Sequence, residues 1–144
     1  MSGRVAASRE VVRNVRCDAG QVIRRCLIVD DNERFLAVAH ACLEREGLEV
    51  VGTAKTIAEA LTKVDVLRPD VVLVDIALGQ ESGFELTRQI VERHPDLRAR
   101  IVLISARREE DFAELITASP AAGFLSKIQL SVRAVGELVA GGCR

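Results

Sequence analysis

The chain has 144 residues, of which 49% are hydrophobic and 28% charged, and its 20 basic side chains nearly balance 21 acidic ones. This length suits one domain with one core, and the near-neutral charge lacks the strong basic excess typical of nucleic-acid-binding domains. No apolar run is long enough to cross a bilayer, and the first residues lack the apolar segment of a secretory signal. We therefore expect a cytoplasmic protein that makes no membrane contact.

The first 24 residues differ from the rest of the chain in charge. They carry five arginines but only two acidic residues, Glu10 and Asp18. This composition is typical of a mobile basic extension. We predict such an extension over residues 1–24, followed by one domain over residues 25–141.

Five short apolar runs follow along the chain, at residues 26–30, 49–54, 71–75, 101–105 and 122–126. Three of these runs are continuous rather than alternating, which is typical of strands buried on both faces of a parallel sheet. Each run is therefore predicted to be a β-strand.

The segments between and after these strands have apolar residues at helical spacing. The predicted stripes are Phe35, Val38, Ala39 and Cys42; Ile57, Ala60, Leu61 and Val64; and, after the last strand, Ile128, Val132, Val135 and Val139. Two helix starts are predicted from capping boxes, formed by Thr56 with Glu59 and by Ser82 with Glu85.

Strand and helix alternate five times, so the crossovers should be right-handed. The expected fold is a doubly wound α/β protein, a flavodoxin-like (βα)5 three-layer sandwich. Its parallel five-stranded sheet should have the order 2-1-3-4-5.

Polar side chains stand where four of the predicted strands end: the pair Asp30 and Asp31, then Asp75, Ser105 and Lys127. Ligands of open α/β sheets bind at the carboxyl ends of the strands, and strands 1 and 3 are neighbours in the expected order. The three carboxylates should therefore converge and repel one another. Mg²⁺ relieves such repulsion and also binds phosphate oxygens, which would leave Asp75 as a carboxylate nucleophile for phosphorus.

Each of these residues also has a purely structural explanation. Asp31 could cap the first helix, Asp30 with Glu33 could imitate a capping box, and Ser105 could cap the fourth helix. Together these explanations are weaker, because four strands would each deliver the needed group by chance. The chain also uses only three lysines against 17 arginines, yet a lysine stands where a phosphate needs a compact charge.

These residues give the chain a resemblance to the receiver domains of bacterial two-component response regulators. It covers residues 25–139 and rests on "LIVDDNERF", "PDVVLVDIALGQESGFEL", "IVLISA" and "AAGFLSK". The resemblance implies that Asp75 is the phosphoacceptor. It also implies that Asp30, Asp31, Asp75 and the backbone carbonyl of Ala77 hold Mg²⁺.

The same resemblance implies further roles in binding phosphate, in switching and in tuning hydrolysis. Ser105 and Lys127 would contact the phosphoryl group, and Phe124, three residues before the lysine, matches the switch aromatic of the family. Ala77 and Arg107 occupy positions that influence how quickly the aspartyl phosphate hydrolyses.

The chain also departs from the family pattern. Gly79 replaces a common proline after the phosphoacceptor, which should loosen that loop, and Ile128 replaces the proline that often follows the lysine. "SGFELTR" and "GFLSKIQLSVRAVGELV" resemble receivers that precede LuxR-type helix-turn-helix domains. We expect no such output domain in this chain.

The resemblance implies a partner that donates phosphate, either a histidine kinase or a phosphotransfer protein, in a phosphorelay. The chain would then be no enzyme beyond its own phosphorylation and slow dephosphorylation. One alternative is an aspartate-nucleophile phosphatase of the haloacid-dehalogenase type, which would need an acid where Ala77 stands. Another is a receiver-like interaction module that works without phosphate.

The output is expected to be a protein contact, with no specific DNA binding by this chain alone. A downstream partner or a second copy should dock on the fourth helix, the fifth strand and the fifth helix, or on the fifth helix alone. The fourth helix is expected to begin at "ARREEDF", a mixed-charge segment that either steers a partner or is a solvated helix face.

Overall fold

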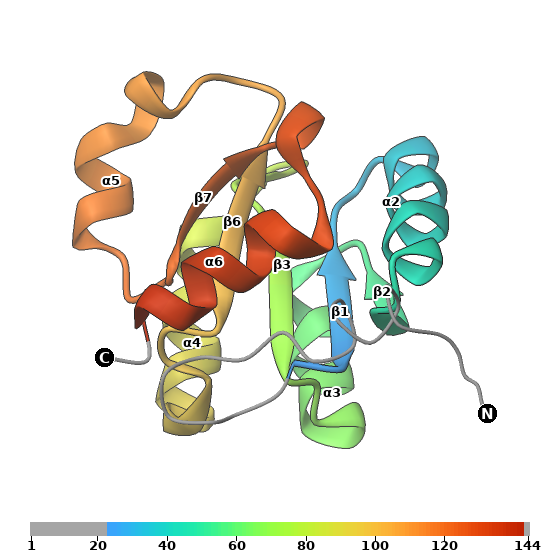
Figure 1. The fold of residues 1–144 in the computed structure, drawn as a ribbon. Helices are drawn as coiled ribbons and strands as arrows, with labels where there is room; N and C mark the ends of the chain where they lie inside the picture. The colour runs from blue at the N-terminus through green and yellow to red at the C-terminus, as the bar shows by residue number, and fades with distance from the viewer. Residues whose placement is uncertain (1–22, 143–144) are drawn as a thin grey trace, which may run out of the picture.

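The computed structural model describes residues 23–142 and contains a five-stranded parallel sheet (Figure 1). The strands are β1 (Arg25–Val29), β2 (Glu49–Ala54), β3 (Val71–Asp75), β6 (Ile101–Ser105) and β7 (Gly123–Ser126). Their order is β2-β1-β3-β6-β7, and every neighbouring pair is parallel. The predicted doubly wound sandwich and its strand order 2-1-3-4-5 are confirmed.

Helices cover both faces of the sheet, as Figure 1 shows. The described α-helices are α2 (Glu33–Arg45), α3 (Ile57–Leu67), α4 (Gly83–Arg93), α5 (Ala113–Ala118) and α6 (Val132–Gly142). One apolar cluster joins α2 and α6 to one face, and a second joins α3 and α4 to the other. Short 3-10 turns add η1 (Pro95–Leu97), η2 (Glu109–Phe112) and η3 (Lys127–Gln129).

The central strands are apolar throughout because helices cover both of their faces. In β1, Cys26 and Ile28 belong to the cluster under α2 and α6, whereas Leu27 and Val29 belong to the cluster under α3 and α4. All five residues of β3 and all five of β6 are buried. The continuous apolar runs therefore reflect two-sided burial, as predicted.

Both predicted helix starts are present, but neither makes the full reciprocal capping box. Thr56 Oγ1 accepts from Glu59 N at 3.1 Å, and Ser82 Oγ accepts from Glu85 N at 3.4 Å. The Glu59 carboxylate accepts from the N–H of Lys55, one residue before the cap. The Glu85 carboxylate instead contacts two side chains of its own helix, Arg88 and Gln89.

Two of the three predicted apolar stripes need correction. In α2 the buried residues are Leu36, Ala39 and Leu43, while Val38 is 67% exposed. Ile128 is 96% exposed because it lies in η3, before α6 begins. The α3 stripe is correct, and α6 buries Val132, Val135 and Val139 as predicted.

The predicted extension falls almost wholly outside the described residues. Ile23, assigned to it from the sequence, is 4% exposed and belongs to the core cluster under α2 and α6. Within residues 23–142 no helix combines the length and the apolar character needed to cross a bilayer.

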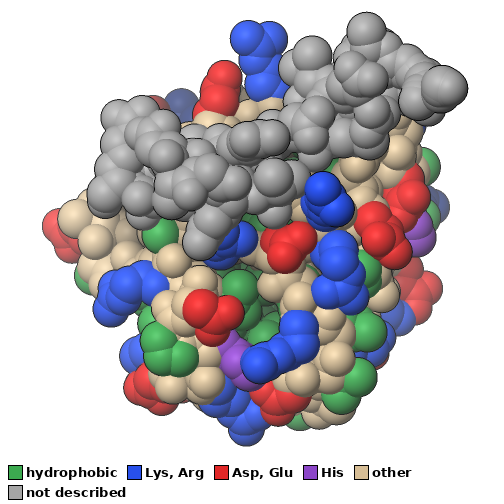
Figure 2. Space-filling view, turned by 60° about the horizontal axis from the view of Figure 1, so that its bottom comes forward, with side chains coloured by type: hydrophobic (Ala, Val, Ile, Leu, Met, Phe, Trp, Pro, Cys, Tyr) green, Lys and Arg blue, Asp and Glu red, His purple; other side chains and the backbone are tan. Residues whose placement is uncertain are grey.

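The lower face of the molecule, at the amino-terminal ends of the strands, mixes basic and acidic side chains (Figure 2). A hollow of about 310 Å³ lies here, where α3 and α4 end and β3 and β6 begin. Its lining includes Arg68, His94 and Arg100 beside Asp70 and Asp96. The hollow therefore lies at the opposite end of the sheet from the polar strand ends described next.

Candidate functional site

Three carboxylates converge at the carboxyl ends of β1 and β3. Asp30 directly follows β1, Asp75 is the last residue of β3, and one oxygen each from Asp30, Asp31 and Asp75 lie within 4.8 Å of one another. Asp30 is fully buried and Asp75 is 6% exposed, while Asp31 faces solvent. The convergence expected from the strand order is present.

The same local turn follows three of the strand ends. In each, a side-chain oxygen accepts a hydrogen bond from the N–H two residues later: Asp30 Oδ1 from Asn32 N at 2.8 Å, Asp75 Oδ1 from Ala77 N at 3.0 Å, and Ser105 Oγ from Arg107 N at 3.0 Å. These turns hold one oxygen of each side chain against its own backbone.

The structure contradicts the three helix-capping roles that could have explained Asp30, Asp31 and Ser105. Asn32, not Asp31, caps α2, because its side chain accepts from Phe35 N. The Glu33 carboxylate pairs with Lys55 rather than completing a capping box with Asp30. Ser105 caps no helix, since the next turn, η2, begins after Arg108 without a side-chain cap.

Lys127, the first residue after β7, brings a positive charge to the carboxylates. Its Nζ lies 2.7 Å from Asp30 Oδ2 and 3.1 Å from Asp75 Oδ2. The contact with Asp30 is an ion pair without hydrogen-bond alignment, so Oδ2 is a buried oxygen with no hydrogen bond among the described residues. Lys127 thus offsets part of the negative charge of the two carboxylates, and Asp30 Oδ2 accepts no hydrogen bond from the rest of the described residues.

Burial and charge act together on these groups. Burial raises the pKa of Asp75, the Ala77 N–H opposes this, and the neighbouring Asp30 charge raises it again, so that the net direction is upward. Burial works against the charge of Lys127, but its contacts with Asp30 and Asp75 prevail and its pKa is raised. Lys127 is therefore an ammonium at neutral pH.

The residues present fit a divalent cation. A hard cation such as Mg²⁺ takes oxygen ligands, and three carboxylates with one unsatisfied buried oxygen provide them. Asp30, Asp31 and Asp75 would hold the ion. Ala77 lies two residues after Asp75, in the short strand β4 (Ala77–Leu78), and the role of its carbonyl stays a prediction.

The loop after Asp75 is more ordered than its glycine suggested. β4 pairs with β5 (Glu81–Ser82) as a two-stranded antiparallel ladder. Gly79 has a φ of 64°, which a residue with a side chain adopts at a cost. The glycine therefore allows the tight turn between β4 and β5.

Ser105 and Phe124 occupy neighbouring strands. Ser105 ends β6 and is 4% exposed, while Phe124 lies in β7, is 8% exposed and belongs to the core cluster under α3 and α4. The guanidinium of Arg107 lies 5.4 Å from the centre of the Phe112 ring, which packs against that same cluster. The predicted roles of Ser105, Phe124 and Arg107 stay predictions.

Sequence reasoning missed Gly83, at the start of α4. Its N–H donates to Ile76 O at 2.9 Å, and a Cβ at this position would lie 2.1 Å from Asp75 O. Only a residue without a side chain lets α4 approach the end of β3 this closely. The glycine after a helix-capping serine was the available signal.

Sequence reasoning also missed how the loop carrying Lys127 is held. Ser126 and Gln129 form a reciprocal capping box around η3, a pattern visible as S-x-x-Q. Phe35, assigned only to an apolar stripe, has its ring centre 4.4 Å from Lys127 Nζ.

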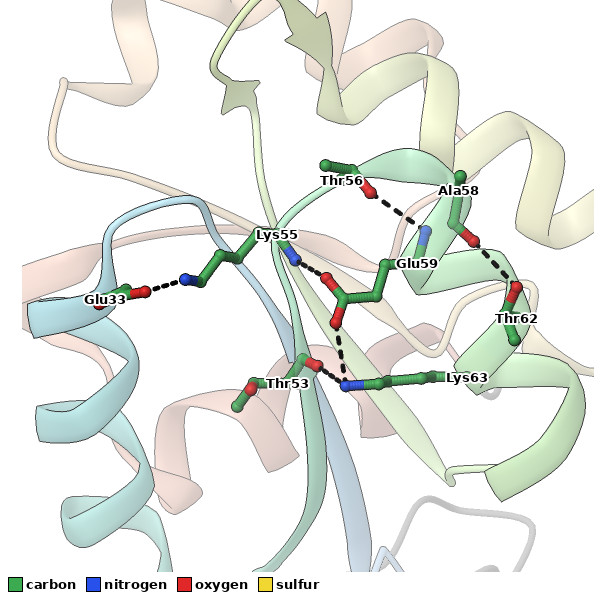
Figure 3. A network of polar contacts seen from close by, with 8 residues as sticks. All are labelled: Glu33, Thr53, Lys55, Thr56, Ala58, Glu59, Thr62 and Lys63. Carbon is green, nitrogen blue, oxygen red and sulfur yellow. Dashed lines mark hydrogen bonds and ion pairs between the residues drawn. The ribbon is translucent and has the colours of Figure 1, made fainter.

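A polar network borders the site on the side of α2 and α3 (Figure 3). Lys55, between β2 and α3, pairs with Glu33 of α2, two residues after Asp31. The contacts with Lys55 lower the pKa of Glu33, and the Lys55 N–H and the Lys63 ammonium do the same for Glu59. These exposed contacts connect the first turn of α2 to the start of α3.

Comparison with known proteins identifies the family. A sequence model described as the response regulator receiver domain matches residues 26–134. The response regulator GacA of Pseudomonas viridiflava is 34% identical over 104 residues, covering 72% of this chain and 48% of the relative. The DNA-binding transcriptional activator DevR/DosR of Mycobacterium tuberculosis is 36% identical over 107 residues, covering 72% and 47%. The chain thus spans about half the length of these relatives.

A solved structure shows the same relationship. A response regulator from Burkholderia pseudomallei "with a phosphorylated aspartic acid, calcium ion and citrate" superposes with a TM-score of 0.69 at 28% identity, covering 81% of this chain and 66% of that one. With the family match over most of the domain, the chain belongs to the response regulator receiver domain family of two-component signal transduction.

Proposed function

We propose that this chain takes a phosphoryl group onto Asp75 from a histidine kinase or a phosphotransfer protein, and that the phosphoryl group switches a protein-interaction surface. The observation that supports this best is the position of Asp75. It ends β3 beside Asp30 and Asp31, and its Oδ2 lies 3.1 Å from Lys127 Nζ. The related Burkholderia structure, which has a phosphorylated aspartic acid and a calcium ion, supports both the product and the cation.

The proposed reaction uses Asp75 as the nucleophile. A carboxylate oxygen of Asp75 attacks phosphorus, an O–P bond forms, and the P–N bond of the donor phosphohistidine breaks as its imidazole leaves. Such transfers depend mainly on positioning and on neutralising the phosphoryl oxygens. A bound Mg²⁺ supplies part of that neutralisation, and the Lys127 ammonium and the Ser105 hydroxyl supply the rest.

The proposed switch runs from Ser105 to Phe124. The Ser105 hydroxyl now accepts from the Arg107 N–H, and a phosphoryl group on Asp75 gives it an acceptor to which it can donate. Its movement makes room for Phe124, one strand away. The surface that changes is formed by α5, β7 and α6, where α5 buries none of its residues and Leu115 is 55% exposed.

Two alternatives are less well supported. A haloacid-dehalogenase-type phosphatase needs an acid two residues after its nucleophile, and Ala77 stands there. A receiver-like module that works without phosphate does not require three converging carboxylates with a lysine between them. Beyond accepting and slowly losing the phosphoryl group, we propose no enzymatic activity.

The test is labelling with a small phosphodonor such as acetyl phosphate, followed by intact mass. One phosphoryl group should be added in the presence of Mg²⁺, and none in excess chelator. Asp96→Asn, which changes an exposed acid at the opposite end of the sheet, should be labelled like the parent. Labelling that is independent of the metal, or no labelling at all, contradicts the proposal.

A further inference from the structure

Lys127 Nζ contacts an aromatic ring in addition to two carboxylates. Besides Asp30 and Asp75, it contacts the ring of Phe35, whose centre is 4.4 Å away. An ammonium at this distance from an aromatic ring is attracted by the ring quadrupole. The ring is therefore a third partner for the charge, contributed by α2.

The ion pairs with Asp30 and Asp75 hold the ammonium as long as both carboxylates are free to attract it. The contact with Asp30 Oδ2 lacks hydrogen-bond alignment, and the lysine stem is flexible. The capping box of Ser126 and Gln129 holds the backbone of η3, not the side chain of Lys127. Ile128, the next residue, is 96% exposed and adds little packing.

Phe35 is itself well fixed. Its N–H donates to Asn32 Oδ1 at 3.1 Å, so it belongs to the capped first turn of α2 that directly follows Asp30 and Asp31. Its side chain is partly buried and packs against the core cluster under α2 and α6. The ring and the acidic residues thus form one local unit.

We propose that Phe35 is a positioning residue for Lys127, holding the ammonium beside Asp75 when the carboxylates are no longer free to do so. A cation bound to Asp30 and Asp75 would neutralise the two charges that attract Lys127. The ring keeps its attraction, because it does not depend on the charge of the carboxylates. Lys127 then stays where an incoming phosphoryl group needs it.

This inference rests on the proposed phosphorylation of Asp75, so its test needs a readout that does not depend on phosphorylation. In isotope-enriched, unphosphorylated protein, the NMR signals of the Lys127 Cε methylene protons should be shifted upfield by the ring current of Phe35. Phe35→Leu should remove that shift with and without Mg²⁺. Phe35→Tyr, which keeps an aromatic ring, should retain it.

The second readout is the rate of labelling by acetyl phosphate at saturating Mg²⁺. Phe35→Leu should slow labelling by roughly three- to thirtyfold, the range expected for a partly desolvated cation–ring contact, and Phe35→Tyr should restore most of the rate. Phe84→Leu is the matched control, because Phe84 is also a partly buried phenylalanine in the first turn of a helix. Its labelling rate should match that of the parent.

The outcomes separate the two claims. Suppose that the parent is phosphorylated by acetyl phosphate. If Phe35→Leu is then phosphorylated equally fast, or if the upfield shift is absent in the parent, the role of Phe35 is wrong and the proposed function stands. If the parent is not labelled while the upfield shift is present, the proposed function fails and the contact between ring and ammonium is real.

Discussion

Lys127 Nζ lies between two carboxylates from different strands, 2.7 Å from Asp30 Oδ2 and 3.1 Å from Asp75 Oδ2. Asp30 follows β1, Asp75 ends β3 and Lys127 directly follows β7, so the three charged groups come from the ends of three different strands. In the metal-free protein it acts as the counter-ion of a site that also fits a divalent cation.

This relationship predicts how Lys127→Met should behave. Without metal, the variant should be less stable by about 3–5 kcal/mol, because a buried carboxylate loses its partner. Mg²⁺ should recover much of the loss, since binding to the folded state stabilises it. Thermal unfolding with and without Mg²⁺ measures both effects.

The matched control is Lys63→Met, because Lys63 pairs with Glu59 and Thr53 O away from the carboxylates. This more exposed pair should contribute about 1 kcal/mol or less. If Mg²⁺ raises the thermal stability of the parent, Lys127→Met and Lys63→Met by the same amount, Lys127 does not interact with the carboxylates that bind the metal.

Gly83→Ala should be costly. The added Cβ would lie 2.1 Å from Asp75 O, and backbone has no rotamer by which to move away. We expect a loss of about 1–3 kcal/mol or more in the free energy of unfolding. At Gly52 the nearest atom is Leu67 Cδ1 at 2.9 Å, the end of a flexible side chain, so Gly52→Ala should cost less. Urea unfolding followed by circular dichroism checks the order, and the reverse order would contradict the close packing of α4 on β3.

Two threonines associated with α3 should contribute differently to the free energy of unfolding. Thr56→Ala removes the cap of α3 and should cost about 1 kcal/mol. Thr62→Ala, in the same helix, removes a hydroxyl that donates to Ala58 O (Figure 3) and should change stability by about 0.5 kcal/mol or less. Equal losses in the two variants, measured by chemical unfolding, would contradict the capping role.

The switch predicts a specific pattern of chemical shifts. Charge-assisted hydrogen bonds from Ser105 and Lys127 to the phosphoryl group together supply roughly 3–6 kcal/mol. Moving the equilibrium between the inactive and active conformations from 1:99 to 99:1 requires about 5.5 kcal/mol. With a phosphate mimic at Asp75, amide and methyl signals around Ser105 and Phe124 should change.

Ser105→Ala should abolish the change at Phe124. Ser119→Ala is the matched control, because the Ser119 hydroxyl also accepts from the N–H two residues later. It should leave the change intact. Shifts confined to the loop after Asp75 would rule out the coupling between Ser105 and Phe124.

The sheet and the acidic cluster were predictable because both follow from local patterns combined with topology. Two-sided burial makes the central strands continuously apolar, and parallel strands place their carboxyl ends together. The exposure of Val38 was not predictable from spacing alone, because four apolar positions in α2 allow more than one buried face. The close approach of Gly83 and the ring contact of Phe35 depend on residues 8 and 92 positions away along the chain, which no short motif records.

The most direct test of the central claim is to locate the phosphoryl group on the chain. Borohydride reduces an aspartyl phosphate to homoserine, and tryptic peptides then show which residue has changed. Because Arg68 precedes proline, Asp75 should fall on the peptide of residues 64–88, whereas Asp30 and Asp31 fall on that of residues 26–34. We predict homoserine at position 75 after labelling with acetyl phosphate and Mg²⁺, and none in Asp75→Asn. Homoserine at position 30 or 31, or in the Asp75→Asn variant, would contradict the account.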